Sequence, residues 1–176
     1  LTQDEVSLER QKVAFIGSGG AVRAVAFALA ELTGVAQITI LGRTASRVAA
    51  LVKDLHDKTP VSVCGSDLYD DLEQILATHT VVIQGTPIGM YPRDNENCIP
   101  AELLRPEHVV FDMVYRPYKT RLLQAAEDQG CRIIPGIEML VNQAALQFER
   151  WTGIPAPYGV MRAVALSELC AQAEGK

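Results

Sequence analysis

A glycine-rich turn lies between a strand-like segment and a helix-like segment near the start of the chain. The apolar run at 13–16 predicts a buried strand, and a helical pattern begins near residue 20. Between these segments, in order, come Gly17, Ser18, Gly19, Gly20, Ala21 and Val22. A turn of this kind brings backbone N–H groups and a helix N-terminus towards a pyrophosphate. We therefore expect the first strand, turn and helix of a dinucleotide-binding βαβ unit.

The match to the G-x-G-x-x-G pattern is incomplete, because Val22 occupies the third glycine position. The alternative is a glycine-rich turn that only joins a strand to a helix. The context favours binding, since a second strand-like run follows at 36–41.

Strand-like runs alternate with helical stretches along the chain, which is typical of a parallel sheet built from βαβ units. Strands are expected at 12–17, 36–41, 61–64, 80–84, 108–114 and 131–135. Helices are expected at 20–33, 45–58, 67–77, 119–129, 138–152 and 158–173. Thr44 is expected to cap the second helix, and Gly34 and Gly130 to end helices. The proline-rich stretch at 87–106 predicts an ordered loop with a short helical turn.

The predicted fold is α/β and Rossmann-like: a doubly wound, mostly parallel six-stranded sheet with helices on both faces. Residues 1–176 are expected to form one domain. Within it, 1–12 is expected to be the end of a connecting helix. The helix in 155–176 is apolar over a broad arc, which predicts packing against a further domain or a second copy.

The helix at 138–152 is expected to bury one apolar stripe. Its members recur mostly at steps of three and four residues: Ile137, Leu140, Val141, Ala144, Leu146, Phe148 and Trp151. Met139 and Gln143 share another face, which a helix after the last strand could turn towards a ligand. The alternative for Gln143 is an ordinary solvated side chain, and the periodicity alone favours that alternative.

Composition excludes several classes of function. The net charge is −5 and the pI about 5.2, which argues against a nucleic-acid binder. No apolar run is long enough to span a bilayer and no signal peptide is visible, so we expect a cytoplasmic protein. The four cysteines and three histidines are scattered, which predicts free thiols and no metal site.

The segment after the second strand-like run carries two arginines and no acid. Arg43 follows Gly42 directly, and Arg47 lies one helical turn later. NAD sites usually place an acid here to accept hydrogen bonds from the ribose, whereas guanidinium groups bind the extra phosphate of NADP. We therefore predict NADP as the cofactor. The alternative is that both arginines are solvated on a helix surface.

Several separated segments together resemble the C-terminal, NADP-binding domain of the shikimate/quinate dehydrogenase family. They lie at 17–24, 42–47, 86–90, 112–115, 136–143 and 148–153, in the order and spacing of that family. The resemblance implies reversible hydride transfer between NADP(H) and 3-dehydroshikimate/shikimate, a step in the biosynthesis of aromatic amino-acid precursors.

The resemblance also implies roles for individual residues. The turn at 17–22 would hold the pyrophosphate, and Arg43, Thr44 and Arg47 the adenosine 2′-phosphate, with Gly42 also in the cofactor site. Thr86 and Pro87 would lie along the nicotinamide side of the dinucleotide. The nicotinamide pocket would be lined by Met113, Val114, Gly136 and Met139. Tyr115 and Gln143 would touch the shikimate-like substrate.

The chain departs from the usual family pattern at several positions. These are Ser18 and Val22 for alanines, Gly42 for Asn, Gln84 and Gly85 for Asn-Ala, and Arg116 for Asn. The departures leave open both the ring substrate and the strength of the NADP preference. One alternative is a relative acting on another polyol or an aminoshikimate-like ring. Another is a non-catalytic nucleotide-sensing module.

No catalytic residue is expected in this chain. The resemblance implies that the catalytic Lys and its partner Asp lie in an N-terminal substrate domain, which nothing before Val13 could supply. Lys119 is expected to cap or solvate the start of a helix, and Asp112 to fix a strand-end turn. Alone, the chain is expected to bind cofactor but turn over little, and the full-length protein is a candidate homodimer.

Overall fold

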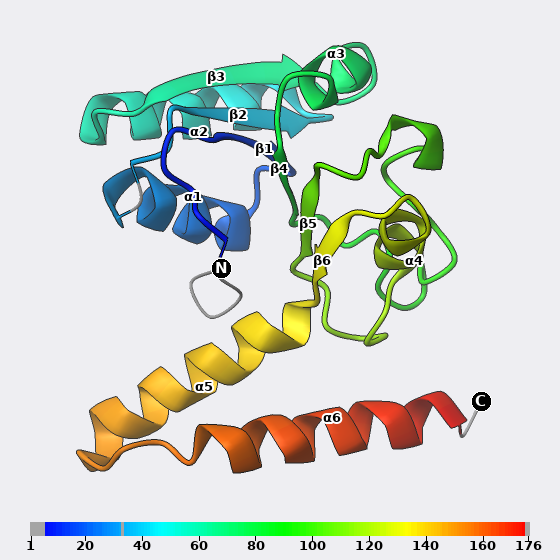
Figure 1. The fold of residues 1–176 in the computed structure, drawn as a ribbon. Coiled ribbons are helices and arrows are strands. Elements are labelled where there is room, and N and C mark those ends of the chain that lie inside the picture. Colours follow the sequence, from blue (N-terminus) through cyan, green and yellow to red (C-terminus); the bar gives the residue numbers. More distant parts are fainter. Residues whose placement is uncertain (1–5, 33, 175–176) are drawn as a thin grey trace.

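The structure, a computed structural model, describes residues 6–32 and 34–174 and contains one sheet with every strand pairing parallel (Figure 1). The strand order is β3-β2-β1-β4-β5-β6. The strands are β1 (Lys12–Ile16), β2 (Gln37–Gly42), β3 (Ser62–Asp67), β4 (Val81–Gln84), β5 (Val109–Asp112) and β6 (Arg132–Ile134). The predicted six-stranded, Rossmann-like sheet is confirmed.

The helices follow the strands in the predicted alternation. They are α1 (Gly20–Leu32), α2 (Ala45–Lys58), α3 (Leu72–Leu76), α4 (Arg121–Asp128), α5 (Gly136–Thr152) and α6 (Tyr158–Glu174). The loop at 87–106 carries the expected helical turn, the 3₁₀ helix η1 (Ala101–Leu103). Gly34 and Gly130, at φ +66° and +77°, end α1 and α4 as predicted.

Two of the helix predictions are wrong. The helix expected at 67–77 is only the short α3, because β3 continues to Asp67 and a turn follows it. The Asp67 carboxylate accepts a hydrogen bond from the Tyr69 N–H at 2.8 Å, and such local bonds compete with helix formation. The connecting helix expected at 1–12 is absent from 6–11, which forms coil and a turn before β1, while residues 1–5 lie outside the described part.

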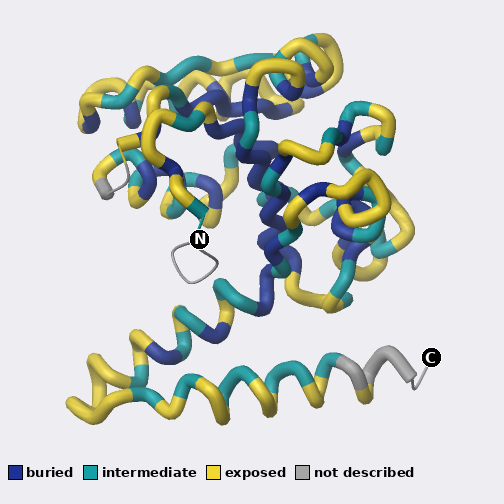
Figure 2. Tube along the Cα trace, viewed as in Figure 1, coloured by how far each residue is buried: buried dark blue, intermediate teal, exposed yellow. Residues whose placement is uncertain are grey.

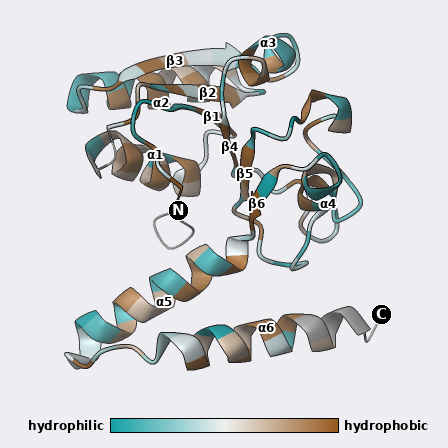
Figure 3. Cartoon of the chain, in the orientation of Figure 1, coloured by the Kyte–Doolittle hydropathy of each residue, from teal (hydrophilic) through white to brown (hydrophobic). Residues whose placement is uncertain are grey.

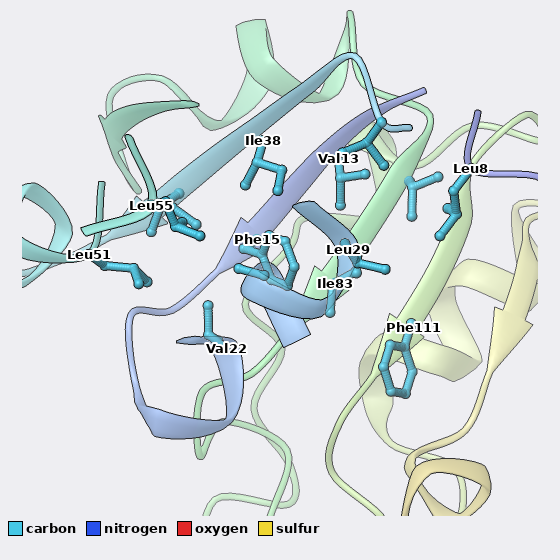
Figure 4. Packing of buried hydrophobic residues seen from close by; sticks show 14 of the residues in the cluster. Leu8, Val13, Phe15, Val22, Leu29, Ile38, Leu51, Leu55, Ile83 and Phe111 are labelled. Carbon is cyan, nitrogen blue, oxygen red and sulfur yellow. The ribbon is translucent and has the colours of Figure 1, made fainter. Parts of the chain in front are cut away.

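The inner strands β1, β2, β4 and β5 are buried on both faces, which explains why they contain apolar runs without alternation. In β1, Val13 and Phe15 point into a cluster covered by α1 and α2 (Figure 4). Their neighbours Ala14 and Ile16 point into a second cluster, covered by α3 and α4. The buried strands form the centre of the molecule (Figure 2). Helices thus cover both faces, as a doubly wound fold requires.

The last two helices form a hairpin that extends away from the sheet (Figure 1). Gly136, Ile137, Val141 and Ala145 are buried in α5, so the predicted stripe is wrong for Leu140, Leu146 and Trp151. Leu146 and Trp151 are 67% and 79% exposed. The reason is that α5 extends beyond the sheet, and the polar residues Glu138 and Asn142 form its hydrogen bonds to α6. Apolar residues run along both helices (Figure 3), and Val160 and Val164 of α6 are also exposed.

The two buried histidines form hydrogen bonds within the fold. The Nε2 of His79 lies 2.9 Å from Thr39 Oγ1, and the Nδ1 of His108 accepts from the Arg105 N–H at 3.1 Å. Burial lowers the pKa of both imidazoles, so they stay neutral near pH 7.

Cys64, Cys98 and Cys131 are free thiols. In the described part of the chain, no group of His, Cys, Asp or Glu side chains could hold a metal ion. Across residues 6–32 and 34–174, no helix is long and apolar enough to cross a bilayer.

Candidate dinucleotide-binding site

The turns that follow four of the strands are joined at the carboxyl edge of the sheet. The Gly17 N–H donates to Leu41 O at 2.7 Å, and the Gly85 N–H donates to Ile16 O at 2.9 Å. The Met113 N–H continues the series to Gln84 O at 2.9 Å. Open α/β sheets bind ligands at this edge, beside the point where the strand order reverses. In the order found here, that point lies between β1 and β4.

The glycine turn after β1 has both the backbone conformation and the close contacts that require glycine. Gly17 has φ +112°, and a Cβ there would lie 3.1 Å from Thr86 Cγ2. Gly19 and Gly20 are exposed, and a Cβ at either would meet no atom within 4 Å. The first turn of α1 contains no acidic residue. Its N–H groups and helix dipole can therefore receive an anion.

The N-terminus of α2 also lies at this edge of the sheet, and two cationic side chains lie beside it. Arg43, Thr44 and Arg47 are all exposed there, and the first turn of α2 contains no acidic residue. Thr44 is the N-cap residue as predicted, but its side chain makes no capping hydrogen bond, so that part of the prediction is wrong. The Arg47 N–H donates to Thr44 O at 3.0 Å, which leaves the N–H groups of Ala45 and Ser46 to receive an anion beside the arginines.

A loop from the other half of the sheet reaches this end of α2. Glu96 accepts hydrogen bonds from Arg93, and its pKa is lowered chiefly by that contact and further by the charge of Arg43. The loop after β4 thus lies close enough to Arg43 for the charges of Glu96 and Arg43 to interact.

A cavity of about 450 Å³ opens beside Gly42, between α2 and β3. Its apolar wall comes from Ala45, Val48, Ala49 and Val52, and Asp67 and Asp71 lie at its acidic end. A Cβ on Gly42 would lie 2.7 Å from Val48 Cγ2. That contact gives a physical reason for glycine at a position where a larger side chain was expected from the resemblance.

On the other side of the glycine turn, the expected nicotinamide-pocket residues lie together. A Cβ on Gly136, the first residue of α5, would lie 2.6 Å from Val114 O and 2.7 Å from Met113 O. Met139 packs against the core cluster that contains Met113 and Val22. The start of α5 is therefore pressed directly onto the loop after β5.

Val22 and Gly85, two of the departures from the usual pattern, are in contact. A Cβ on Gly85 would lie 2.4 Å from Val22 Cγ2 and 3.0 Å from Met113 Sδ. Val22 is fully buried and β-branched, so its methyl group has little room to move. The larger side chain in the glycine turn is thus matched by the smaller residue after β4.

This contact predicts a compensating pair of substitutions. Gly85→Ala is expected to lower the free energy of unfolding by about 2 kcal/mol through overpacking, and Val22→Ala by a similar amount through a cavity. The double variant Val22→Ala/Gly85→Ala is expected to recover at least about 1 kcal/mol relative to the sum of the single effects. Urea unfolding of the four proteins measures this coupling. Additive losses would show that the two residues do not compete for the same space.

A buried polar network joins the ends of β4 and β5 to the start of α4. Oδ1 of Asp112 accepts from the Val114 N–H at 2.9 Å and from Gln84 Nε2 at 3.2 Å. Oδ2 of Asp112 accepts from Thr120 Oγ1 at 2.6 Å. Thr120 in turn caps α4 by accepting from the Leu123 N–H at 3.2 Å. The prediction that Asp112 fixes the strand-end turn is confirmed.

Gln84 occupies the centre of the loop that follows β4. Its Nε2 also donates to Ile88 O at 2.9 Å, and its Oε1 accepts from the Thr86 N–H. The side chain is buried, with every polar atom directed at the protein. Gln84 therefore shapes the loop, and its departure from the usual pattern gives no support to a different substrate.

The remaining predicted residues lie at exposed positions. Tyr115 follows the network directly and is 43% exposed, and Gln143 is exposed on α5. Lys119 pairs with Glu127 of α4, in place of the predicted cap at the start of that helix. Thr120 had no predicted role, and Gln84 was noted only as a departure from the family pattern. A threonine directly before a helical pattern could have indicated the cap at Thr120, whereas nothing in the sequence indicated that Gln84 bonds to Asp112.

Comparison with known proteins assigns this site to a family. Residues 1–112 match the family model described as "Shikimate / quinate 5-dehydrogenase", and residues 136–166 match "Shikimate 5'-dehydrogenase C-terminal domain". The chain is 40% identical over 160 residues to shikimate dehydrogenase (NADP(+)) of Methanopyrus kandleri, covering 90% of the chain and 55% of the relative. It is 41% identical over 162 residues to the enzyme of the same name from Pyrococcus abyssi, covering 92% and 56%. The chain thus spans just over half the length of these relatives.

Solved structures show the same arrangement. Shikimate 5-dehydrogenase from Listeria monocytogenes, in complex with shikimate and NAD, superposes with a TM-score of 0.85 at 32% identity, over 93% of this chain and 58% of that one. The enzyme from Thermus thermophilus, in complex with NADP(H) and shikimate, superposes with a TM-score of 0.79 at 30% identity, over 94% and 58%.

Proposed function

Because the chain belongs to the shikimate/quinate dehydrogenase family, we propose that it is the dinucleotide-binding part of an NADP-dependent oxidoreductase. The reaction is reversible hydride transfer between NADP(H) and a shikimate-like ring, with 3-dehydroshikimate/shikimate as the substrate pair. The relatives that are named for NADP support the choice of cofactor. Within the chain, the pair of exposed arginines at the start of α2 carries the proposal.

The adenosine half of the dinucleotide lies across β1 and β2 in this proposal. The N-terminus of α1 binds the pyrophosphate through its backbone N–H groups. Arg43 and Arg47 bind the 2′-phosphate, with Thr44 and the uncapped N–H groups of α2 beside them. The planar guanidinium of Arg43 is also suited to stacking on the adenine ring.

The nicotinamide half lies across β4 and β5. Thr86 and Pro87 border the ring, and Met113, Val114, Gly136 and Met139 form its pocket. These side chains are mostly apolar, so they exclude water from a ring that exchanges hydride. Tyr115 and Gln143, both exposed, contact the substrate from this side.

The proton transfer that accompanies hydride transfer needs a further group, because the hydroxyl of the substrate must lose a proton. We assign this role to no residue of this chain, because Asp112 is enclosed in its network and Lys119 pairs with Glu127. The relatives contain nearly as much sequence again beyond the matched region, and we place the acid–base pair there. The chain by itself is expected to bind the dinucleotide with little turnover.

Binding of the two dinucleotides tests the arginine assignment. The chain is expected to bind NADP⁺ at least about tenfold more tightly than NAD⁺, which is about 1.4 kcal/mol, by isothermal titration calorimetry. Arg43→Ala is expected to weaken NADP⁺ binding and leave NAD⁺ binding nearly unchanged. Arg132→Ala is a matched control, because this exposed arginine begins β6 at the opposite edge of the sheet. Equal affinities for the two dinucleotides, or equal losses in Arg43→Ala, would contradict the proposal.

A further inference from the structure

The carboxylate of Asp112 binds both loops of the proposed nicotinamide side. Through Gln84 it holds the loop after β4, and through the Val114 N–H it holds the loop after β5. Through Thr120 it also holds the start of α4, where the second of these loops ends. The Asp112 side chain is fully buried and contacts no solvent.

The network requires an acceptor at both carboxyl oxygens. Oδ1 receives two N–H donors, and Oδ2 receives a hydroxyl whose own oxygen already accepts from the Leu123 N–H. The ionised carboxylate accepts all three bonds as charge-assisted hydrogen bonds, which are about twice as strong as neutral ones. A proton on either oxygen, or an amide in place of the carboxylate, removes that charge and requires the Thr120 hydroxyl to turn, so the ties weaken.

The surroundings of Asp112 make its ionisation sensitive to pH. Burial raises its pKa to about 6, and the hydrogen bonds from Thr120, Val114 and Gln84 oppose that shift. The N-terminus of α4 also favours the anion. The side chains that face the carboxylate are neutral: Gln84 from β4, Thr120 from the start of α4, and the Cys98 thiol from the loop after β4. The pKa of Cys98 is raised to about 12, chiefly by burial and further by Asp112, so this thiol stays protonated.

We propose that Asp112 is a positioning residue for the nicotinamide half of the site: its carboxylate holds the loops after β4 and β5 in their binding geometry, and its protonation releases them. This inference rests on the proposed function, since it assumes that the two loops border the nicotinamide. It adds a pH-dependent control of one half of the dinucleotide site, with the adenosine half unaffected.

The test compares two ligands that share the adenosine half. NADP⁺ reaches both halves of the site, whereas 2′,5′-ADP carries the pyrophosphate-proximal and 2′-phosphates without the nicotinamide. At about pH 8, Asp112→Asn is expected to weaken NADP⁺ binding about tenfold and 2′,5′-ADP binding less than about twofold. Thr120→Val, which removes one tie and keeps the carboxylate, is expected to act in the same direction. Asp57→Asn is the matched control, because Asp57 is an exposed aspartate paired with Lys53 on α2.

A pH series separates positioning from a purely structural role. The ratio of NADP⁺ affinity to 2′,5′-ADP affinity in the wild-type chain, divided by the same ratio in Asp112→Asn, is expected to fall as the pH is lowered from about 8 to about 5. In Asp112→Asn, the ratio is expected to be low at about pH 8 and to change with pH only through the phosphates of the ligands. The titration of these phosphates, including the 5′-phosphomonoester that only 2′,5′-ADP carries, is common to both proteins and cancels in this comparison. Circular dichroism confirms that each variant is folded, and Thr120→Val provides the same comparison if Asp112→Asn does not fold.

Three results would overturn the inference: equal losses for both ligands, no loss for either, or a wild-type ratio that stays a constant multiple of the Asp112→Asn ratio across the pH series. Equal affinity of the wild-type chain for 2′,5′-ADP and NADP⁺ would also overturn the inference, but it would leave the assignment of the adenosine half of the site unchanged. Failure of the wild-type chain to bind either ligand is a separate outcome, which contradicts the proposed function itself.

Discussion

Replacing Gly136 with alanine is expected to lower the free energy of unfolding by about 3 kcal/mol, the upper end of the overpacking range. The added methyl group would lie 2.6 Å from Val114 O and 2.7 Å from Met113 O. Both are backbone atoms of a buried loop, so no side chain can rotate away to relieve the contact. Either α5 or the loop after β5 must shift, and the shift would also disturb the proposed nicotinamide pocket.

Gly159→Ala supplies the control for the intrinsic effect of alanine in a helix. Gly159 lies in the first turn of α6, is exposed, and a Cβ there would meet no atom within 4 Å. This substitution is expected to raise the free energy of unfolding by about 0.5–1 kcal/mol. Urea unfolding measures both variants. A Gly136→Ala protein as stable as Gly159→Ala would show that α5 does not press on the loop as the structure describes.

Asp112→Asn is expected to change how stability depends on pH. The pKa of Asp112 in the folded chain is about 6, against an ordinary value of 3.8, so between these values the folded state binds the proton more tightly. The contribution of this group to stability is therefore present below about pH 4 and is lost as the pH rises through about 6. Two pKa units correspond to up to about 3 kcal/mol. The wild-type chain is expected to lose that much relative to Asp112→Asn between about pH 4 and pH 7.

The difference between the two proteins isolates Asp112 from the other titrating groups. His79 and His108 have lowered pKa values, so their contribution has the opposite sign and is lost as the pH falls below about 6.5. This contribution is common to both proteins and cancels. Urea unfolding at a series of pH values gives the difference directly. A difference that is constant with pH, or that grows in favour of the wild type as the pH rises, would contradict a raised pKa.

A group that reduces stability at neutral pH and yet binds two loops of a site is typical of function gained at the expense of stability. The two experiments on Asp112→Asn are therefore complementary. The variant is expected to lose less stability than the wild type as the pH rises from about 4 to about 7, and to bind NADP⁺ more weakly at about pH 8. A residue with only a structural role would show neither this pH-dependent difference in stability nor a loss confined to NADP⁺.

The sequence predicted the sheet well, because its signals are local. The inner strands β1, β2, β4 and β5 contain short apolar runs, and most helices between the strands have periodic apolar residues, so their alternation implies parallel βαβ units. Gly34 and Gly130 ended helices where expected, since a positive φ is a property of one residue and its neighbours. The length of α3 was wrong because Asp67 and Asp71 hold the preceding turn through side-chain bonds, which periodicity does not reveal.

The sequence predicted where the candidate site residues lie in the fold, but it did not predict the bonds that they form with one another. The residues after β1, β2, β4 and β5 gather at one edge of the sheet, as their placement at strand ends implies. The bond from Gln84 to Asp112 joins residues 28 apart in sequence and exists only because β4 lies beside β5. The stripe on α5 failed for a related reason: periodicity identifies the apolar side of a helix, but not which part of the helix is covered.

The strand order places the proposed contacts to the two halves of the dinucleotide on two separate, continuous stretches of the chain. The proposed contacts to adenosine all precede residue 48, those to nicotinamide and substrate all follow residue 84, and the two sets meet where β1 lies against β4. Such an arrangement is modular. In the proposed arrangement, exchange of the short segment after β2 is expected to change the preference between NADP and NAD without altering the nicotinamide side.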